Sequence, residues 1–187
     1  MSAAVDRFRE VLARYAGKQE LVEIFEDEEE TDIPEVGMVL SVSEDYYSLS
    51  KVDAQGRPDG SYVGLIEDIR RIGVGTQYLA AIELLYQRHK SATLLPYADE
   101  PKPTFDSMLE VLEFAQVTRQ VVCVLTDELF FGFVGNFTSE HVEIREVNKS
   151  GIEDGIQFLD LDQVVRIDFG GPAEEARRFL HQVRLGL

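Results

Sequence analysis

The residues of this chain that could do chemistry are few: three histidines, one cysteine and some short motifs. His89, His141 and His181 lack the close spacing of a metal cluster, and a single cysteine cannot complete one. Cys123 lies in an apolar run, where a free cysteine usually packs as a small hydrophobic side chain. A nucleophilic role would also need a base and an orienting group, and the sequence identifies neither. We therefore predict no catalytic, cofactor-binding or metal-binding residues, no cofactor and no enzymatic activity.

Three motifs could suggest chemistry but favour structural interpretations. Gly73-Val74-Gly75 precedes a predicted helix, as phosphate-binding loops do, yet Tyr78 stands where the fingerprint needs a third glycine. The loop 53–60 carries acids and glycines without the alternating oxygen ligands of a calcium loop. A bare Ser-x-x-Lys at 48–51 has no companion groups for acyl transfer. We predict turns at the first two motifs and a chance match at the third.

The elements that would position these residues occur twice. Residues 5–28 align without a gap on 105–128, and residues 43–87 align on 138–182. The identical pairs include Asp6/Asp106, Leu12/Leu112, Val22/Val122, Gly56/Gly151, Asp59-Gly60/Asp154-Gly155, Arg71/Arg166, Gly75/Gly170 and Leu85/Leu180. A repeat of ~90 residues is the size of a small domain.

The duplication predicts the domain organisation. We expect a first repeat over residues 1–93, a proline-rich linker over 94–103 and a second repeat over 104–187. The first repeat carries an additional acidic loop within residues 26–35.

Each repeat is predicted to contain a helix, five strands and a second helix. An apolar helical period opens both repeats, and β-rich or alternating runs follow. The expected strands are 21–25, 38–42, 47–52, 62–65 and 69–72, then 121–125, 130–137, 142–147, 157–159 and 164–169; the closing helices are 77–89 and 172–183. Asp59-Gly60 and Asp154-Gly155 predict tight turns between the third and fourth strands, because glycine supplies positive φ without steric cost.

Composition narrows the classes of partner. The net charge is −17, so a nucleic acid would be repelled at long range and would find few cations for its phosphates. No run approaches the roughly 18 apolar residues of a membrane span, and residues 1–10 do not resemble a secretory signal. Together with the single cysteine, these features predict a cytoplasmic protein that does not bind membranes, and they argue against binding to nucleic acids.

The pattern of a helix followed by five short, bent strands resembles the Sm-like (LSm) family. In the second repeat Gly132-Phe133-Val134-Gly135-Asn136-Phe137, followed by His141-Val142-Glu143-Ile144, is similar to the family's first motif. In the first repeat the similar stretches are 37–42 and 46–49. The resemblance implies a mainly β, α+β protein of bacterial type, with two tandem Sm-like/SH3-like small barrels and flanking helices.

The same resemblance implies an RNA pocket that this chain retains only in part. A ring remains at the stacking position as Tyr46 and His141, the candidate nucleic-acid residues. The base-contacting asparagine is replaced by Ser48 and Glu143, and the second motif's Arg-Gly pair falls on Leu65-Ile66 and Asp160-Leu161.

Three functions remain open from the sequence. The favoured one is a non-enzymatic binding or scaffold protein that acts through protein–protein contacts, with homo-oligomers formed through barrel edges as a further expectation. The alternative is an RNA- or other nucleic-acid-binding Sm-like protein, which a basic strip at Arg70, Arg71, Arg88 and Lys90 would support. The third, an enzyme or small-ligand protein, requires a pocket with convergent titratable groups.

Overall fold

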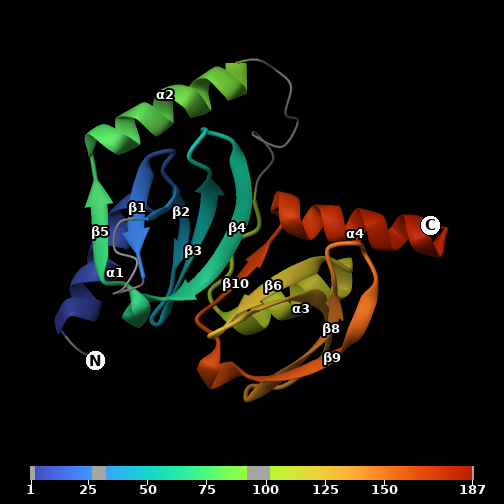
Figure 1. Cartoon of the computed structure of the whole chain (residues 1–187). Coiled ribbons are helices and arrows are strands. Elements are labelled where there is room, and N and C mark those ends of the chain that lie inside the picture. The colour runs from blue at the N-terminus through green and yellow to red at the C-terminus, as the bar shows by residue number, and fades with distance from the viewer. Residues whose placement is uncertain (1–2, 27–32, 92–101, 187) are drawn as a thin grey trace. The chain divides into compact units, whose positions relative to one another are not determined.

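A computed structural model describes residues 3–26, 33–91 and 102–186 of the chain. In this part the protein is mainly antiparallel β with four α-helices, which confirms the predicted α+β class (Figure 1). None of its helices combines the length and apolar character that crossing a membrane requires. Most of the predicted acidic loop (26–35) and of the linker (94–103) lies outside the described residues.

Contacts divide the chain into two compact units. Unit 1 is Met1–Asp59 with Gly64–Asp106, and unit 2 is Gly60–Val63 with Ser107–Leu187.

Unit 1 is organised around one antiparallel sheet. Its elements are α1 (Ala3–Tyr15), β1 (Leu21–Phe25), β2 (Glu35–Val42), β3 (Tyr46–Val52), β4 (Pro58–Leu65, whose centre belongs to unit 2), a 3-10 turn η1 (Ile66–Asp68), β5 (Arg71–Val74) and α2 (Gln77–Ser91). The strand order is β5-β1-β2-β3-β4, and β1 pairs with both β2 and β5. Helix α2 follows directly from β5 (Figure 1).

Unit 2 contains the same series of elements. They are α3 (Met108–Thr118), β6 (Val121–Leu125), β7 (Leu129–Phe137), β8 (His141–Val147), β9 (Glu153–Asp160), a 3-10 turn η2 (Leu161–Gln163), β10 (Arg166–Phe169) and α4 (Pro172–Leu185). The strand order is β10-β6-β7-β8-β9. In this unit the Tyr62 ring of β4 lies 4.9 Å from the Arg166 guanidinium carbon, so this part of β4 lies close to β10.

The two series match in detail. From the third strand onward the element positions differ by close to the 95 residues that separate 43 from 138 in the sequence alignment. A register shift follows Val39 in the β2–β3 pair, and another follows Val134, 95 residues later, in the β7–β8 pair. Interior glycines permit these close strands: a Cβ at Gly132 would stand 2.2 Å from the carbonyl oxygen of Arg145.

Each unit buries the apolar face that its sequence pattern predicts. Leu12, Val22, Ile24, Tyr47 and Leu49 are fully buried in unit 1, as are Leu112, Val122, Val124, Ile144 and Ile167 in unit 2. A separate cluster fixes α2 against the strands of unit 1: Leu21, Val36, Val52, Leu79, Ile82 and Tyr86.

Two sequence predictions are wrong in position. The fifth strand of the first repeat is 71–74 instead of 69–72, because the Ile69 amide donates to the Ile66 carbonyl (3.2 Å) and closes the 3-10 turn. Gly60 and Gly155 do have positive φ, +81° and +97°, but they lie inside β4 and β9. The tight turns come earlier, at residues 53–57 and 148–152, and the fourth strands are correspondingly longer.

Candidate functional site

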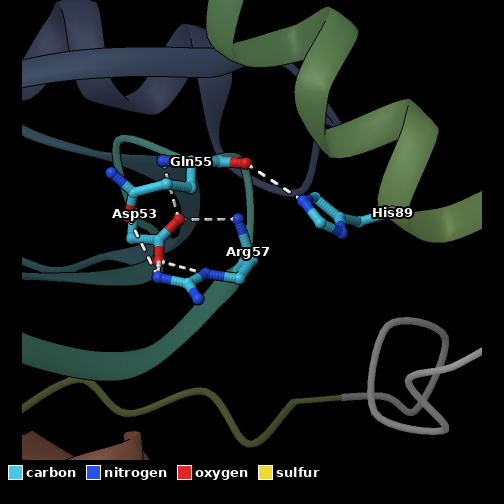
Figure 2. Close-up of polar contacts among 4 residues, drawn as sticks. All are labelled: Asp53, Gln55, Arg57 and His89. Atoms are coloured by element: carbon cyan, nitrogen blue, oxygen red, sulfur yellow. Dashed lines mark hydrogen bonds and ion pairs between the residues drawn. The ribbon is translucent and has the colours of Figure 1, made fainter.

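The β3–β4 turn of unit 1, considered above as a calcium loop, holds Asp53, Gln55 and Arg57, and His89 of α2 lies beside it (Figure 2). Asp53 Oδ1 accepts hydrogen bonds from the Gln55 amide (2.9 Å) and the Arg57 amide (2.8 Å). Its Oδ2 accepts from Arg57 Nε at 2.7 Å. At the end of α2, His89 Nε2 lies 3.1 Å from the Gln55 carbonyl oxygen. A carbonyl oxygen only accepts hydrogen bonds, so His89 Nε2 is the donor. The carboxylate is engaged by its own turn, which explains the acid-and-glycine loop without a cation.

Unit 2 repeats this turn with different side chains. Asn148 Oδ1 accepts from the Ser150 amide (2.9 Å) and the Ile152 amide (3.2 Å). Arg184 of α4 donates to the Ser150 carbonyl at 2.8 Å, in the place that His89 takes in unit 1. His181 Nδ1 lies 3.3 Å from the Gly151 carbonyl oxygen. His89 and His181 therefore both fasten a turn to the last part of a helix.

The first glycine of the motif at 73–75 lies beside a buried carboxylate. Glu23 is 6% exposed and stands opposite Gly73 in the β1–β5 pair. Its Oε1 accepts from Thr76 Oγ1 at 2.6 Å, and Thr76 Oγ1 caps α2 by accepting from the Leu79 amide at 3.1 Å. A Cβ at Gly73 would stand 2.1 Å from Glu23 Oε2, so the glycine makes room for the carboxylate. Negative charge from the chain itself thus occupies the start of α2.

The corresponding place in unit 2 holds a carboxylate from the other strand. Cys123, the counterpart of Glu23, is buried and in no disulfide, and it stands opposite Asp168 of β10 in the β6–β10 pair. Asp168 is 6% exposed and accepts from Arg166 Nε at 3.0 Å. Arg71, the counterpart of Arg166, stacks on the Phe25 ring with its guanidinium carbon 3.7 Å from the ring centroid. The recurring arginine therefore packs on aromatic rings in both units.

Tyr46 and His141 occupy equivalent places at the start of β3 and β8, each in its own unit. Tyr46 is half-buried, and His141 is exposed with Nδ1 3.1 Å from Thr138 Oγ1. Acids flank both rings: Glu44 and Asp45 precede Tyr46, while His141 follows Glu140 and pairs opposite Asp160. Arg9 Nε donates to the Glu44 carbonyl at 2.8 Å, so the neighbourhood of Tyr46 holds one arginine among these acids.

The basic residues that would support nucleic-acid binding are not contiguous along unit 1. Arg70 and Arg71 stand at the start of β5, whereas Arg88 and Lys90 lie in the last turn of α2. Arg88 lies eleven residues after Gln77 in this helix, which is roughly 16 Å along the axis.

A cavity of about 240 Å³ in unit 1 is lined by three lysines among other residues. Lys18, Lys51 and Lys102 line it together with Ser50 and Tyr86; the other lining residues are Gly17, Gln19, Met38, Val39, Leu40, Val52, Pro58 and Thr104. Lys102 Nζ donates to Ser50 Oγ at 2.7 Å. Burial lowers the pKa of the Lys102 ammonium below its ordinary value.

The edge strand β9 of unit 2 exposes apolar side chains. β9 has one strand neighbour, β8, within the described part of the chain. Ile156 and Phe158 project from it with 53% and 69% of their surfaces exposed. The aligned residues of β4, Ser61 and Val63, are 3% and 0% exposed. The corresponding strands β9 and β4 therefore differ sharply in the exposed fraction of their side chains.

The sequence analysis did not identify the lysine cavity or the exposed apolar edge of β9. The three lysines are far apart in the chain, and the alternation at 156–158 is equally typical of a strand with a covered face. The described residues contain no group of three His, Cys, Asp or Glu side chains arranged to hold a metal ion. No protein-family model, curated protein or solved structure matches this chain.

Proposed function

We propose that this chain is a non-enzymatic interaction protein that acts in the cytoplasm through protein–protein contacts at the β9 edge. We further propose that each repeat is a small Sm-like, SH3-like barrel. The strand order within each unit and the 3-10 turn between the fourth and fifth strands support the second proposal. Cys123 is buried and in no disulfide, which supports the cytoplasmic location in the first proposal.

The observation that carries the interaction proposal is the exposed apolar edge of β9. An edge strand presents unpaired backbone N–H and C=O groups and can accept another strand. Natural edges are usually protected by charge, proline or a bulge. Here the middle of the edge carries Ile156 and Phe158, and the acids Glu153, Asp154 and Asp160 stand towards its ends. Such an edge suits an extended apolar segment with cationic residues at one end.

The chain contains a segment with that chemistry: β5 of a second copy. Its Val74 is 40% exposed and Ile72 is partly exposed, and Arg70 and Arg71 stand at its start. β5 has β1 as its one strand neighbour among the described residues. Its counterpart β10 is covered, with Ile167 and Phe169 0% and 4% exposed. In unit 2 the buried part of β4 lies close to β10. β9 is the counterpart of β4 and β5 is the counterpart of β10, so pairing β9 with β5 of another copy would repeat that arrangement.

Such pairing is head to tail, because the two edges differ. It would lead to a ring if the rotation closes and to a filament if it does not. The Phe158 side chain sets the scale of the attraction. A phenylalanine offers about 200 Å², of which 69% is exposed. Burying that area at about 25 cal/mol per Å² contributes up to about 3 kcal/mol, equivalent to over a hundredfold in affinity.

Sedimentation equilibrium over a concentration series tests the proposal. Wild-type chains of 21.1 kDa should associate with a dissociation constant of about 1–100 μM. Phe158→Glu should abolish association, whereas Val117→Glu should leave it unchanged, because Val117 is 75% exposed but lies on α3. A wild type that stays monomeric at about 1 mM, or equal weakening by both substitutions, would contradict the proposal.

A further inference from the structure

We propose that the lysine cavity of unit 1 binds a small organic molecule that carries a carboxylate or phosphate group on an apolar body. The proposal is independent of the β9 edge, which belongs to unit 2. It rests on the charge of the walls, the environment of Lys102 and the size of the space.

The charge of the cavity walls is opposite to that of the protein. The chain has 35 Asp and Glu against 18 Lys and Arg, yet three lysines and no acid stand among the described residues that line the cavity. Lys18 follows α1, Lys51 lies on β3, and Lys102 comes from the segment before α3. Three separate parts of unit 1 therefore bring lysines to one concavity. Lysines at one site favour the binding of an anion.

Lys102 is the cation with the most to gain from an anion. Its Nζ donates to the hydroxyl of Ser50, which is 2% exposed, and no carboxylate of the described residues forms an ion pair with it. An ammonium group has three N–H donors, so further donors remain for a ligand. Burial lowers the pKa of this group, which reflects the cost of holding a charge with little solvent. A bound anion would offset that cost.

The remaining walls indicate the rest of the ligand. Met38, Val52, Pro58 and Tyr86 provide apolar surface, and Gln19, Ser50 and Thr104 provide polar groups. At about 240 Å³ the cavity is slightly smaller than the roughly 300–1,000 Å³ of common ligand sites. It therefore suits a small aromatic or branched acid or a small phosphate ester, and excludes a folded polyanion.

The experiment is a titration of the ¹⁵N-labelled full chain with benzoate and, separately, with inorganic phosphate, at constant ionic strength maintained with chloride. Amide shifts should concentrate at residues 17–19, 50–52 and 102–104. A stronger response to benzoate would identify carboxylates on apolar bodies as the ligand class, and a stronger response to phosphate would identify phosphate esters.

Variants decide whether the lysines carry the binding. Lys102→Met keeps the apolar stem and should weaken binding of the better anion at least tenfold. Lys149→Met, at an exposed turn of unit 2, should leave the affinity unchanged. Lys18→Met tests the same site at an exposed position, and should weaken binding severalfold even if Lys102→Met disturbs folding. Shifts that spread evenly over the surface, or equal affinities in all four proteins, would overturn the proposal.

Discussion

Gly151→Ala should destabilise the protein well beyond the cost of its backbone angle. Gly151 has φ +75°, and a left-handed alanine costs about 1–2 kcal/mol. The added Cβ would also stand 2.6 Å from the backbone nitrogen of His181 and 2.6 Å from Leu180 Cβ, so α4 or the turn must shift. Overpacking of this kind costs typically about 1–3 kcal/mol more. We expect a total loss of about 2–5 kcal/mol in the free energy of unfolding.

Gly155→Ala is the matched control. Gly155 has φ +97°, yet nothing lies within 4 Å of the position of its Cβ, so only the backbone cost of about 1–2 kcal/mol applies. Thermal unfolding followed by circular dichroism should place the midpoint of Gly151→Ala several degrees below that of Gly155→Ala, because 1 kcal/mol corresponds to about 2–4 °C in a chain of this size. Equal midpoints would refute the argument that the turn is held by contact with α4.

Two further predictions concern charge. Burial lowers the pKa of Lys102, so the folded state loses this proton at a lower pH than the unfolded state. The destabilising effect of the Lys102 charge should therefore fade as the pH rises toward the ordinary pKa of 10.5. Between neutral pH and that value, the free energy of unfolding in urea should change less with pH for Lys102→Met than for wild type. A fluorescently labelled single-stranded oligonucleotide should show no sub-micromolar binding in anisotropy at about 0.15 M salt, because the net charge of −17 and the acids beside Tyr46 and His141 oppose phosphate; tight binding there would instead restore the nucleic-acid function.

The sequence predicted the structure best where a pattern of residues is typical of a single kind of element. The apolar runs at 21–25 and 121–125 are strands with the predicted bounds, because short runs rich in branched residues are typical of buried strands. The fifth strand of the first repeat was misplaced because Ile69 and Ile72 suit a strand equally well, and the hydrogen bond that closes the 3-10 turn decides between them. Asp-Gly suggested a turn, but the side chains of Asp53 and Asn148 stabilise the turns that form.

The candidate sites depend on facts that a local pattern cannot contain. Lys18, Lys51 and Lys102 meet only because α1, β3 and the segment before α3 pack in one unit. The exposure of Ile156 and Phe158 depends on which strands stand beside β9, and alternation within a strand does not specify its neighbours. By contrast, the structural roles of Cys123 and the 53–60 loop followed from residue chemistry alone.

Sedimentation velocity on a mixture of two edge variants tests the central claim most directly. One variant carries Phe158→Glu in β9, and the other carries Arg70→Glu and Val74→Glu at β5. Head-to-tail pairing predicts that each variant alone is a monomer of 21.1 kDa, and that the mixture forms a one-to-one dimer through the intact β5 of the first and the intact β9 of the second. A mixture that remains monomeric while the wild type associates, or a β9 variant that still associates alone, would contradict pairing between β9 and β5.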